Sequence, residues 1–249
     1  MSRDLGVTGA LRELVPGWSV EGFAISALLG DLVVIVPVLA LVYLTAVLAG
    51  LRQSNESQRD EPLCPDRTAV LIAVVFGGLA LVVLLKAAFS MPRPSAELHA
   101  VSASEHGFPS GHTMAATVFW GGLALWSSVA SHRARFAAAG VVVSVVGFSR
   151  LALGVHYFVD VVASVLFGGV YLAVAAWIVG DRPTRAFALA VGIAVLATAV
   201  AGVSGRALLA LSGTAGAALG WWLLERPPVR RLLVRAYDRS LGGSLGRSG

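Results

Sequence analysis

The chain has little charge, almost no cysteine and a single lysine. Of its 249 residues, 13% are charged and 57% are apolar, whereas soluble domains average about 25% and about 45–50%. With a mean hydropathy of +0.80, this composition excludes an ordinary soluble domain and a disordered chain, because so much apolar surface cannot be hidden in one soluble core. The one cysteine, Cys64, excludes an internal disulfide and a zinc site built from several cysteines. An integral membrane protein remains.

Long apolar runs fill most of the chain, and each is close to the roughly 20 residues that a helix needs to cross a bilayer. They are continuous rather than alternating, and backbone groups in lipid must be satisfied within the segment, so they predict helices and not the strands of a barrel. The sequence thus predicts an all-α membrane protein with about seven transmembrane helices, at residues 29–50, 68–89, 113–130, 136–153, 158–179, 186–203 and 207–224.

The polar segments suggest how the chain is divided around these spans. Residues 1–26 are expected to form a poorly ordered lead-in, in which 5–15 could make a short interfacial helix. Residues 27–225 would be the transmembrane domain, in which the polar, proline-containing stretch 52–67 is a surface loop. The arginine-rich residues 226–249 would be a flexible cytoplasmic tail on or near the membrane surface.

Basic residues are distributed unevenly between the two sides of seven helices. If the last two spans form a hairpin around Ser204-Gly205-Arg206, thirteen basic residues lie on one side and six on the other. The positive-inside rule then places the first side in the cytoplasm. If the last two spans are instead one broken helix, the tail changes sides and the preference weakens. The net charge of +5 does not indicate nucleic acid, because the basic residues lie between apolar runs and follow the membrane rule.

Three polar clusters lie at span ends on the side with fewer basic residues. Lys86 lies at the end of the second span and Arg93-Pro94 follows it, and Pro109-Ser110-Gly111-His112 precedes the third. Ser149-Arg150 and His156 to Asp160 join the fourth span to the fifth. Three cations, two histidines and a carboxylate therefore meet on one face of the membrane.

Each cluster has a chemical interpretation that suits a phosphate ester. Arginine offers a planar fork and lysine a point charge for a multiply charged phosphate, and Ser110-Gly111 before a helix supplies a hydroxyl and backbone N–H groups to an anion. His156 and Asp160, four residues apart, are expected to be neighbours on one helix face. The aspartate would fix the imidazole tautomer and leave the other nitrogen as nucleophile, with His112 free to protonate the leaving oxygen. Asp31, at the outer end of the first span, is expected to be an interfacial residue or a helix cap.

In order and spacing, Lys86-x6-Arg93-Pro94, Pro109-Ser110-Gly111-His112 and Ser149-Arg150-x5-His156-x3-Asp160 resemble the three motifs of the type 2 phosphatidic acid phosphatase (PAP2) superfamily. That superfamily includes membrane lipid phosphatases and vanadate-dependent haloperoxidases. The resemblance covers roughly residues 68–180 and includes every motif position. It implies a six-helix core and metal-independent cleavage of a phosphomonoester or diphosphate through a phosphohistidine. It further implies phosphate binding by Lys86, Arg93, Ser110, Gly111 and Arg150, with His156 as nucleophile, Asp160 as its partner and His112 as acid.

The sequence thus predicts a multi-pass cell-membrane phosphatase, without cofactor or metal, whose active site faces the outside. Phosphatidate, phosphatidylglycerol phosphate and polyprenyl diphosphate all present a suitable terminal phosphate, and the sequence does not choose between them. Two alternatives stay open, namely a phosphotransferase with an alcohol acceptor and a non-enzymatic transporter or lipid-binding protein. The sequence fixes neither the oligomeric state nor the role of the last two spans.

Overall fold

The computed structural model describes residues 6–53 and 61–245, and within these ranges the chain is helical and contains no strand. A lone β-bridge pairs Pro92 with His106. The α-helices and 3-10 helices are α1 (Gly6–Leu14), η1 (Gly17–Ser19), α2 (Val20–Ala27), η2 (Leu28–Gly30), α3 (Leu32–Gln53), α4 (Asp66–Phe89), η4 (Ala96–Leu98), α5 (Gly111–Trp126), α6 (His132–Ala152), α7 (Phe158–Val179), α8 (Pro183–Ala201), α9 (Gly205–Leu224) and α10 (Pro227–Leu245).

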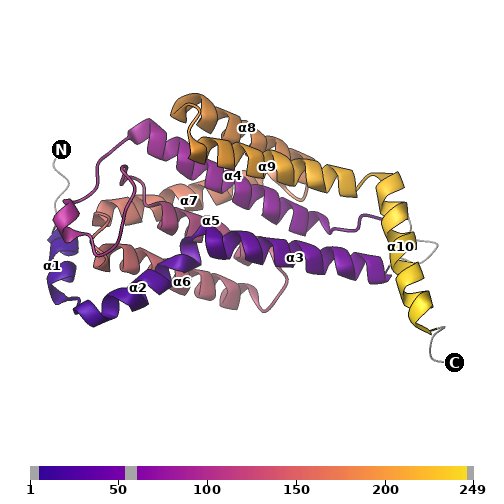
Figure 1. The fold of residues 1–249 in the computed structure, drawn as a ribbon, viewed down its shortest axis with the longest axis horizontal. Helices are drawn as coiled ribbons and strands as arrows, with labels where there is room; N and C mark the ends of the chain where they lie inside the picture. The colour runs from indigo at the N-terminus through magenta and orange to yellow at the C-terminus, as the bar shows by residue number, and fades with distance from the viewer. Residues whose placement is uncertain (1–5, 54–60, 246–249) are drawn as a thin grey trace.

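The long helices run side by side in one elongated bundle (Figure 1). α4 lies near its middle and packs against α5 on one side and against the α8–α9 pair on the other. α4 is apolar around its whole circumference, which is typical of a helix buried among others, and its residues from Ala69 to Val75 are buried. The buried core therefore surrounds α4 and α5, and the other long helices surround them.

Six helices are long and apolar enough to cross a membrane, namely α3, α4, α6, α7, α8 and α9. The remaining predicted span, 113–130, is the third in chain order and corresponds to α5. This helix has only 16 residues and at 1.5 Å per residue is about 24 Å long. Its residues from Thr113 to Phe119 are buried between other helices, so it lies inside the protein rather than against lipid. The prediction of an all-helical membrane fold is confirmed, and the prediction for α5 extended too far at its C-terminal end.

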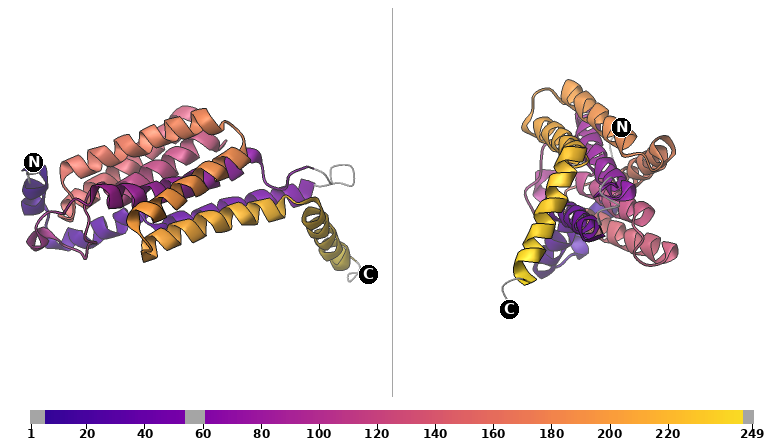
Figure 2. Two further views of the ribbon diagram at one scale, coloured as in Figure 1. Left: turned by 90° about the horizontal axis from the view of Figure 1, so that it is seen from above. Right: turned by 90° about the vertical axis from the view of Figure 1, so that its right-hand side faces the viewer.

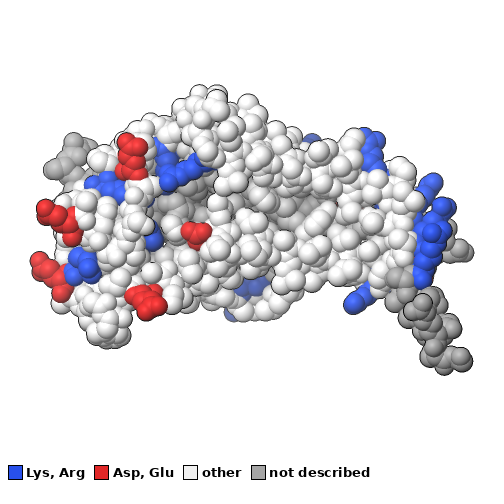
Figure 3. Space-filling view, viewed as in Figure 1, with Lys and Arg blue, Asp and Glu red and all other residues white. Residues whose placement is uncertain are grey.

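Most charged side chains on the face shown lie toward the two ends of the bundle, and the surface between them is largely uncharged except for basic atoms at its edges (Figure 3). One end carries both acidic and basic groups, and the α10 end is mainly basic on the face shown. Such a largely uncharged surface between charged ends is the pattern expected where a bilayer surrounds the protein.

The last two spans form a hairpin, because α8 and α9 pack against each other and both pack against α4. The tail is therefore on the same side as the 52–67 loop, of which residues 54–60 lie outside the described residues. The predicted flexible tail is wrong for 227–245, which form α10 across the end of the bundle (Figure 2). The consecutive prolines Pro227 and Pro228 are acceptable in a first helical turn and could have indicated a helix start. The glycine and serine residues at the end of the chain instead favoured the prediction of a flexible tail. Residues 246–249 of that prediction lie outside the described residues.

The N-terminal residues are also more ordered than the sequence predicted. α1 and α2 pack against α6 at the end of the bundle opposite α10 (Figure 1). Phe23 contacts Phe148 with ring centroids 5.7 Å apart, and the Arg12 Nε donates to the Leu98 carbonyl at 3.1 Å. The described part of the lead-in, residues 6–26, is therefore helical rather than poorly ordered, and α1 agrees with the short helix suggested at 5–15. Packing against other helices stabilises short helices that their own sequence does not. Residues 1–5 lie outside the described residues.

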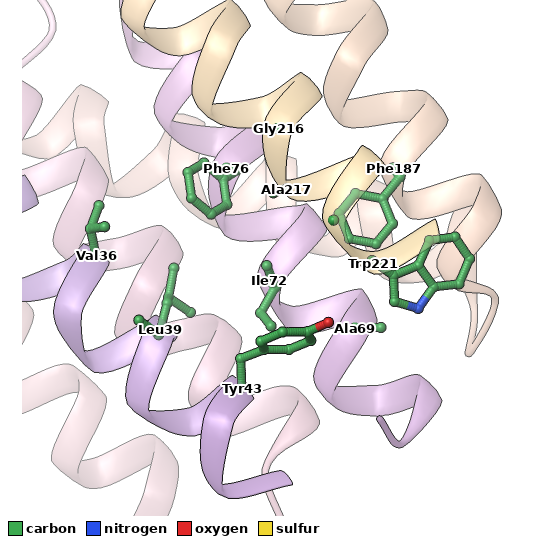
Figure 4. A pocket seen from close by; sticks show the side chains of 12 residues that line it. Val36, Leu39, Tyr43, Ala69, Ile72, Phe76, Phe187, Gly216, Ala217 and Trp221 are labelled. Carbon is green, nitrogen blue, oxygen red and sulfur yellow. The ribbon is translucent and has the colours of Figure 1, made fainter. Parts of the chain in front are cut away.

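An apolar cavity of about 280 Å³ opens between α3, α4, α8 and α9. Figure 4 shows Ile72, Phe76 and Phe187 on its walls, with the Tyr43 hydroxyl and the Trp221 indole as its polar groups. No charged side chain lines it. A phosphate needs charge and hydrogen-bond donors, so this cavity is not the candidate site.

Candidate active site

The three motifs meet at the end of the bundle that carries α1. Lys86 lies in the last turn of α4, which stops at Ser90, whose φ of 44° is left-handed. Arg93 follows in the connection, as the two flanking prolines predicted. Ser110 precedes α5, Arg150 lies in the last turn of α6, and Asp160 lies in the first turn of α7. The antiparallel packing of these helices brings together segments that are far apart in sequence.

His156 is fully buried beside Asp160, with the two side chains 1% and 0% exposed. The Nδ1 atom of His156 lies 3.3 Å from the Asp160 carboxylate, which also accepts the Tyr157 N–H at 3.0 Å. The pair was predicted to share a helix face, but α7 begins only at Phe158. His156 therefore precedes the helix, and Asp160 reaches it by pointing back over the helix start, where a carboxylate is favoured.

Arg93 contacts the other nitrogen of His156. Its Nη1 lies 2.9 Å from His156 Nε2 and donates to the Val155 carbonyl at 2.7 Å. Its Nη2 donates to the Ser104 hydroxyl at 2.9 Å, and its Nε donates to the Ser104 carbonyl. A guanidinium has no acceptor atom, so His156 Nε2 must accept the hydrogen bond from Arg93. The ring proton is therefore on Nδ1, which faces Asp160.

Burial and the neighbouring cations Arg93, Arg150 and Lys86 together hold the pKa of His156 well below its usual range. The imidazole is therefore neutral at neutral pH. Its Nε2 lone pair faces the cations, and its Nδ1–H is held by a carboxylate. This is the electronic state that a nitrogen nucleophile requires.

Arg150 is the unusual cation of the cluster. Its side chain is only 6% exposed, yet its buried Nε has no partner. Among the described residues, no acceptor lies within hydrogen-bond distance of this Nε. Asp31 is the opposite charge that acts on Arg150, and a buried N–H without an acceptor is costly, so the geometry suits an anion beside Arg150.

Lys86 and the start of α5 lie next to one another. The Lys86 ammonium donates to the His106 carbonyl at 3.0 Å. A Cβ on Gly111 would lie 3.2 Å from Lys86 Cε, so the glycine leaves room for the lysine side chain to pass. The first-turn N–H groups of α5 have no partner within their helix and remain suited to an anion.

Ser110 differs from the prediction that its hydroxyl is offered to an anion. It is fully buried, its hydroxyl pairs with the Thr113 hydroxyl at 3.0 Å, and its N–H donates to the Asp160 carbonyl at 3.3 Å. Its carbonyl accepts from the Ser164 hydroxyl at 3.0 Å. Ser110 thus ties the start of α5 to the start of α7, a contact between two helices that the local motif could not reveal.

Residues 67–184 match the family model of the PAP2 superfamily, and all three motifs lie inside that stretch. This part of the chain belongs to the PAP2 superfamily. The fold agrees with a solved structure described as the first transmembrane PAP2 type phosphatidylglycerolphosphate phosphatase, from Bacillus subtilis, with a TM-score of 0.54 and 23% sequence identity over 69% of this chain and 82% of the other. The comparison with curated proteins finds no match.

The second histidine of the PAP2 region has a partner outside it. His112 Nε2 lies 3.0 Å from the carboxylate of Asp31, and the two side chains are 31% and 37% exposed. The hydrogen bond from His112 lowers the pKa of Asp31 to about 2. Asp31 also accepts the Val33 N–H at 3.0 Å, so the predicted helix cap is confirmed. The contact with His112 was missed, because no sequence spacing links two residues so far apart.

Thr8, which like Asp31 precedes the PAP2 region, contacts His156. The buried hydroxyl of Thr8 in α1 donates to the His156 carbonyl at 3.0 Å. Nothing in the sequence around Thr8 indicates this contact. The N-terminal segment, residues 6–31, therefore touches both histidines. Among the residues that the structure describes, no group of three or more His, Cys, Asp or Glu side chains is placed to hold a metal ion.

Proposed function

We propose that this protein is a membrane lipid phosphatase that removes a terminal phosphate from a lipid phosphate or polyprenyl diphosphate. His156 would be the nucleophile, the intermediate would be a phosphohistidine, and no metal would take part. The relative from Bacillus subtilis is described as a phosphatidylglycerolphosphate phosphatase, which supports the same class of substrate for this chain.

The buried Nε of Arg150, which has no hydrogen-bond partner among the described residues, is the observation that carries this proposal. Arg150, Arg93 and Lys86 all act on His156 electrostatically, so a phosphate bound by them would lie beside the imidazole. Three cations suit a multiply charged group, and they would neutralise the equatorial oxygens of the transferring phosphoryl group. Positioning and charge stabilisation supply most of the rate in such a reaction.

The first step transfers the phosphoryl group to the enzyme. Arg93 Nη1, which contacts His156 Nε2 at 2.9 Å, exchanges that contact for a phosphate oxygen. The Nε2 lone pair attacks phosphorus in line, the bond from phosphorus to the leaving oxygen breaks, and His112 donates a proton to that oxygen. Asp160 stabilises the positive charge that develops on the His156 ring.

The second step releases inorganic phosphate. His112, now unprotonated, removes a proton from water as the water oxygen attacks phosphorus. The N–P bond breaks, and its electron pair returns to His156 Nε2. Both histidines are then in their starting protonation states.

The site lies at the end of the bundle away from α10, and we place that end outside the cell. The hairpin of α8 and α9 puts the arginine-rich tail with the 52–67 loop on the opposite, more basic side. By the positive-inside rule that side is cytoplasmic. The hydrocarbon tail of the substrate would lie in the bilayer, with its phosphate at the outer surface.

The test is release of phosphate by purified, detergent-solubilised protein from phosphatidate, phosphatidylglycerol phosphate and a polyprenyl diphosphate, in the presence of EDTA. We expect at least one lipid to be hydrolysed by the wild type and by His132→Asn, and none by His156→Asn. His132 is a matched control because it is an exposed histidine at the opposite end of α6. Folding of each variant is checked by size-exclusion chromatography and by its Tm.

Three results would change the proposal. Loss of activity in EDTA would contradict the metal-independent mechanism, and full activity of His156→Asn would contradict the nucleophile. Phosphate found on an added alcohol, rather than free in solution, would make the protein a phosphotransferase. No release from any lipid by folded wild type would leave an anion-binding membrane protein as the better description.

A further inference from the structure

We infer that Asp31 is a positioning residue for His112, supplied to the active site by the N-terminal segment. This inference rests on the proposed function, in which His112 is the acid and then the base. Asp31 lies outside residues 67–184, the part of the chain that matches the superfamily, and outside all three motifs. Its role would therefore be a feature of this chain added to the shared site.

The contact fixes which nitrogen of His112 exchanges protons with the substrate. Nε2 lies 3.0 Å from one oxygen of Asp31, while the other oxygen accepts the Val33 N–H at 3.0 Å. A carboxylate accepts hydrogen bonds and does not donate them, so Nε2 keeps its proton. Nδ1 is then the atom that carries the proton to the leaving oxygen and later removes one from water.

The carboxylate also supports the protonated imidazole that the first step needs. Four groups surround the His112 side chain. They are Asp31, which directly precedes α3, Arg150 in α6, Arg93 in the connection after α4, and the His156 ring. Burial and both arginines disfavour a positive charge on His112, and Asp31 opposes them. Without Asp31, two cations would surround an acid that must itself be cationic.

The backbone around Asp31 is held firmly against α5. Gly30 packs on the backbone of His112 so closely that a Cβ would collide with the His112 carbonyl. The Trp120 indole N–H donates to the Leu29 carbonyl at 3.0 Å, which attaches η2 to α5 two turns further along. Asp31 is thus attached to the helix that carries His112.

The test compares Asp31→Asn and Asp31→Glu with a matched control, Glu97→Gln. Glu97 is an exposed carboxylate in η4, in the connection that follows Arg93. Asparagine can still accept the Val33 N–H, so Asp31→Asn removes the charge and keeps the helix cap. Hydrolysis of phosphatidate, phosphatidylglycerol phosphate and a polyprenyl diphosphate in detergent is measured from pH 5 to pH 9, with Tm as a check on folding.

We expect Asp31→Asn to lower kcat by about 10-fold to 100-fold with little change in KM, which is less than the roughly 10²-fold to 10⁴-fold that a whole acid–base group contributes, because His112 itself remains. The alkaline limb of kcat/KM should move to lower pH by about one unit, because the protonated imidazole loses its counter-charge. Asp31→Glu should recover part of the activity and of the pH profile. Glu97→Gln should match the wild type.

A double-mutant cycle separates a role through His112 from a general structural effect. In a His112→Asn background, the further change Asp31→Asn should have almost no effect on the residual rate. An equal loss in both backgrounds, or a wild-type pH profile for Asp31→Asn, would overturn the inference while leaving the phosphatase intact. If neither the wild type nor Glu97→Gln released phosphate, the proposed function would fail and the inference with it.

Discussion

The two histidines of the candidate site differ in how each obtains its carboxylate. His156 is completely buried, and its partner Asp160 is four residues away on the same local segment. His112 is part-exposed, and its partner Asp31 comes from the N-terminal segment, outside the region shared with the superfamily. A short motif encodes the first pair, whereas only the packing of η2 on α5 creates the second.

Burial also sets how much each pair is expected to contribute. A charge interaction in a buried, low-dielectric site is stronger and less screened by salt than one near water. Asp160 therefore stabilises positive charge on His156 more effectively than Asp31 does on His112. On the proposed mechanism, the two carboxylates should differ in effect by at least tenfold.

The largest effect is expected from Asp160→Asn. An asparagine amide would favour a His156 tautomer with its proton on Nε2, so the nucleophilic lone pair would be lost. We expect kcat to fall by about 10³-fold to 10⁴-fold, by analogy with a carboxylate-to-amide change in a catalytic triad. The matched control is Asp238→Asn, an exposed aspartate on α10. A loss no greater than that of Asp31→Asn would remove the contrast between the two histidines.

A smaller loss of activity is expected from Arg150→Met, together with an opposite effect on stability. Removing one phosphate-binding cation should lower kcat/KM by about 10²-fold to 10³-fold. Because the buried Nε of this guanidinium lacks a hydrogen-bond partner among the described residues, an apolar side chain of similar length should leave the Tm unchanged or raise it.

A ligand-binding measurement sharpens the Arg150 prediction. Inorganic phosphate or vanadate should raise the Tm of the wild type, because a ligand that binds the folded state stabilises it, and should do so much less for Arg150→Met. A marked drop in the Tm of ligand-free Arg150→Met would mean that Arg150 serves the fold, contrary to the proposal.

The smallest effect is expected from Thr8→Val, which tests how the N-terminal segment supports the buried histidine. The change removes the hydroxyl that donates to the His156 carbonyl and should reduce the free energy of unfolding by about 1 kcal/mol. Activity should change by less than tenfold, because His156 and Asp160 keep their own contact. Thr45→Val is the control, since the Thr45 hydroxyl bonds only to its own helix. Equal Tm values for the two variants would contradict a supporting role for Thr8.

Most of the fold could be predicted from the sequence because a bilayer imposes one strong constraint. Apolar runs near 20 residues must become helices, so all seven predicted segments exist, with errors of a few residues at their ends. The exceptions have physical causes. α5 is shorter than a membrane span because protein surrounds it. α1, α2 and α10 lie at the two ends of the bundle, and their sequences contain no long apolar run that would predict a helix.

The candidate site was also predicted in part. The sequence placed Lys86, Arg93, His112, Arg150 and the His156–Asp160 pair at one face, because each follows or precedes a span end on the same side. The buried pairing of the Ser110 hydroxyl with Thr113 was not predicted, because the spacing of a motif does not reveal which partner a hydroxyl finds.

The sequence by itself determined the seven long helices of the bundle, the end of the bundle at which the polar motifs meet and the local pairing of His156 with Asp160. These follow from periodicity, hydropathy and neighbours a few residues apart, and each is a local property. Only the tertiary structure decided that the buried Nε of Arg150 has no hydrogen-bond partner among the described residues, that Thr8 reaches His156, and that Asp31 pairs with His112. Such contacts join segments distant in the chain, and they exist only when the packing of whole helices brings those segments together.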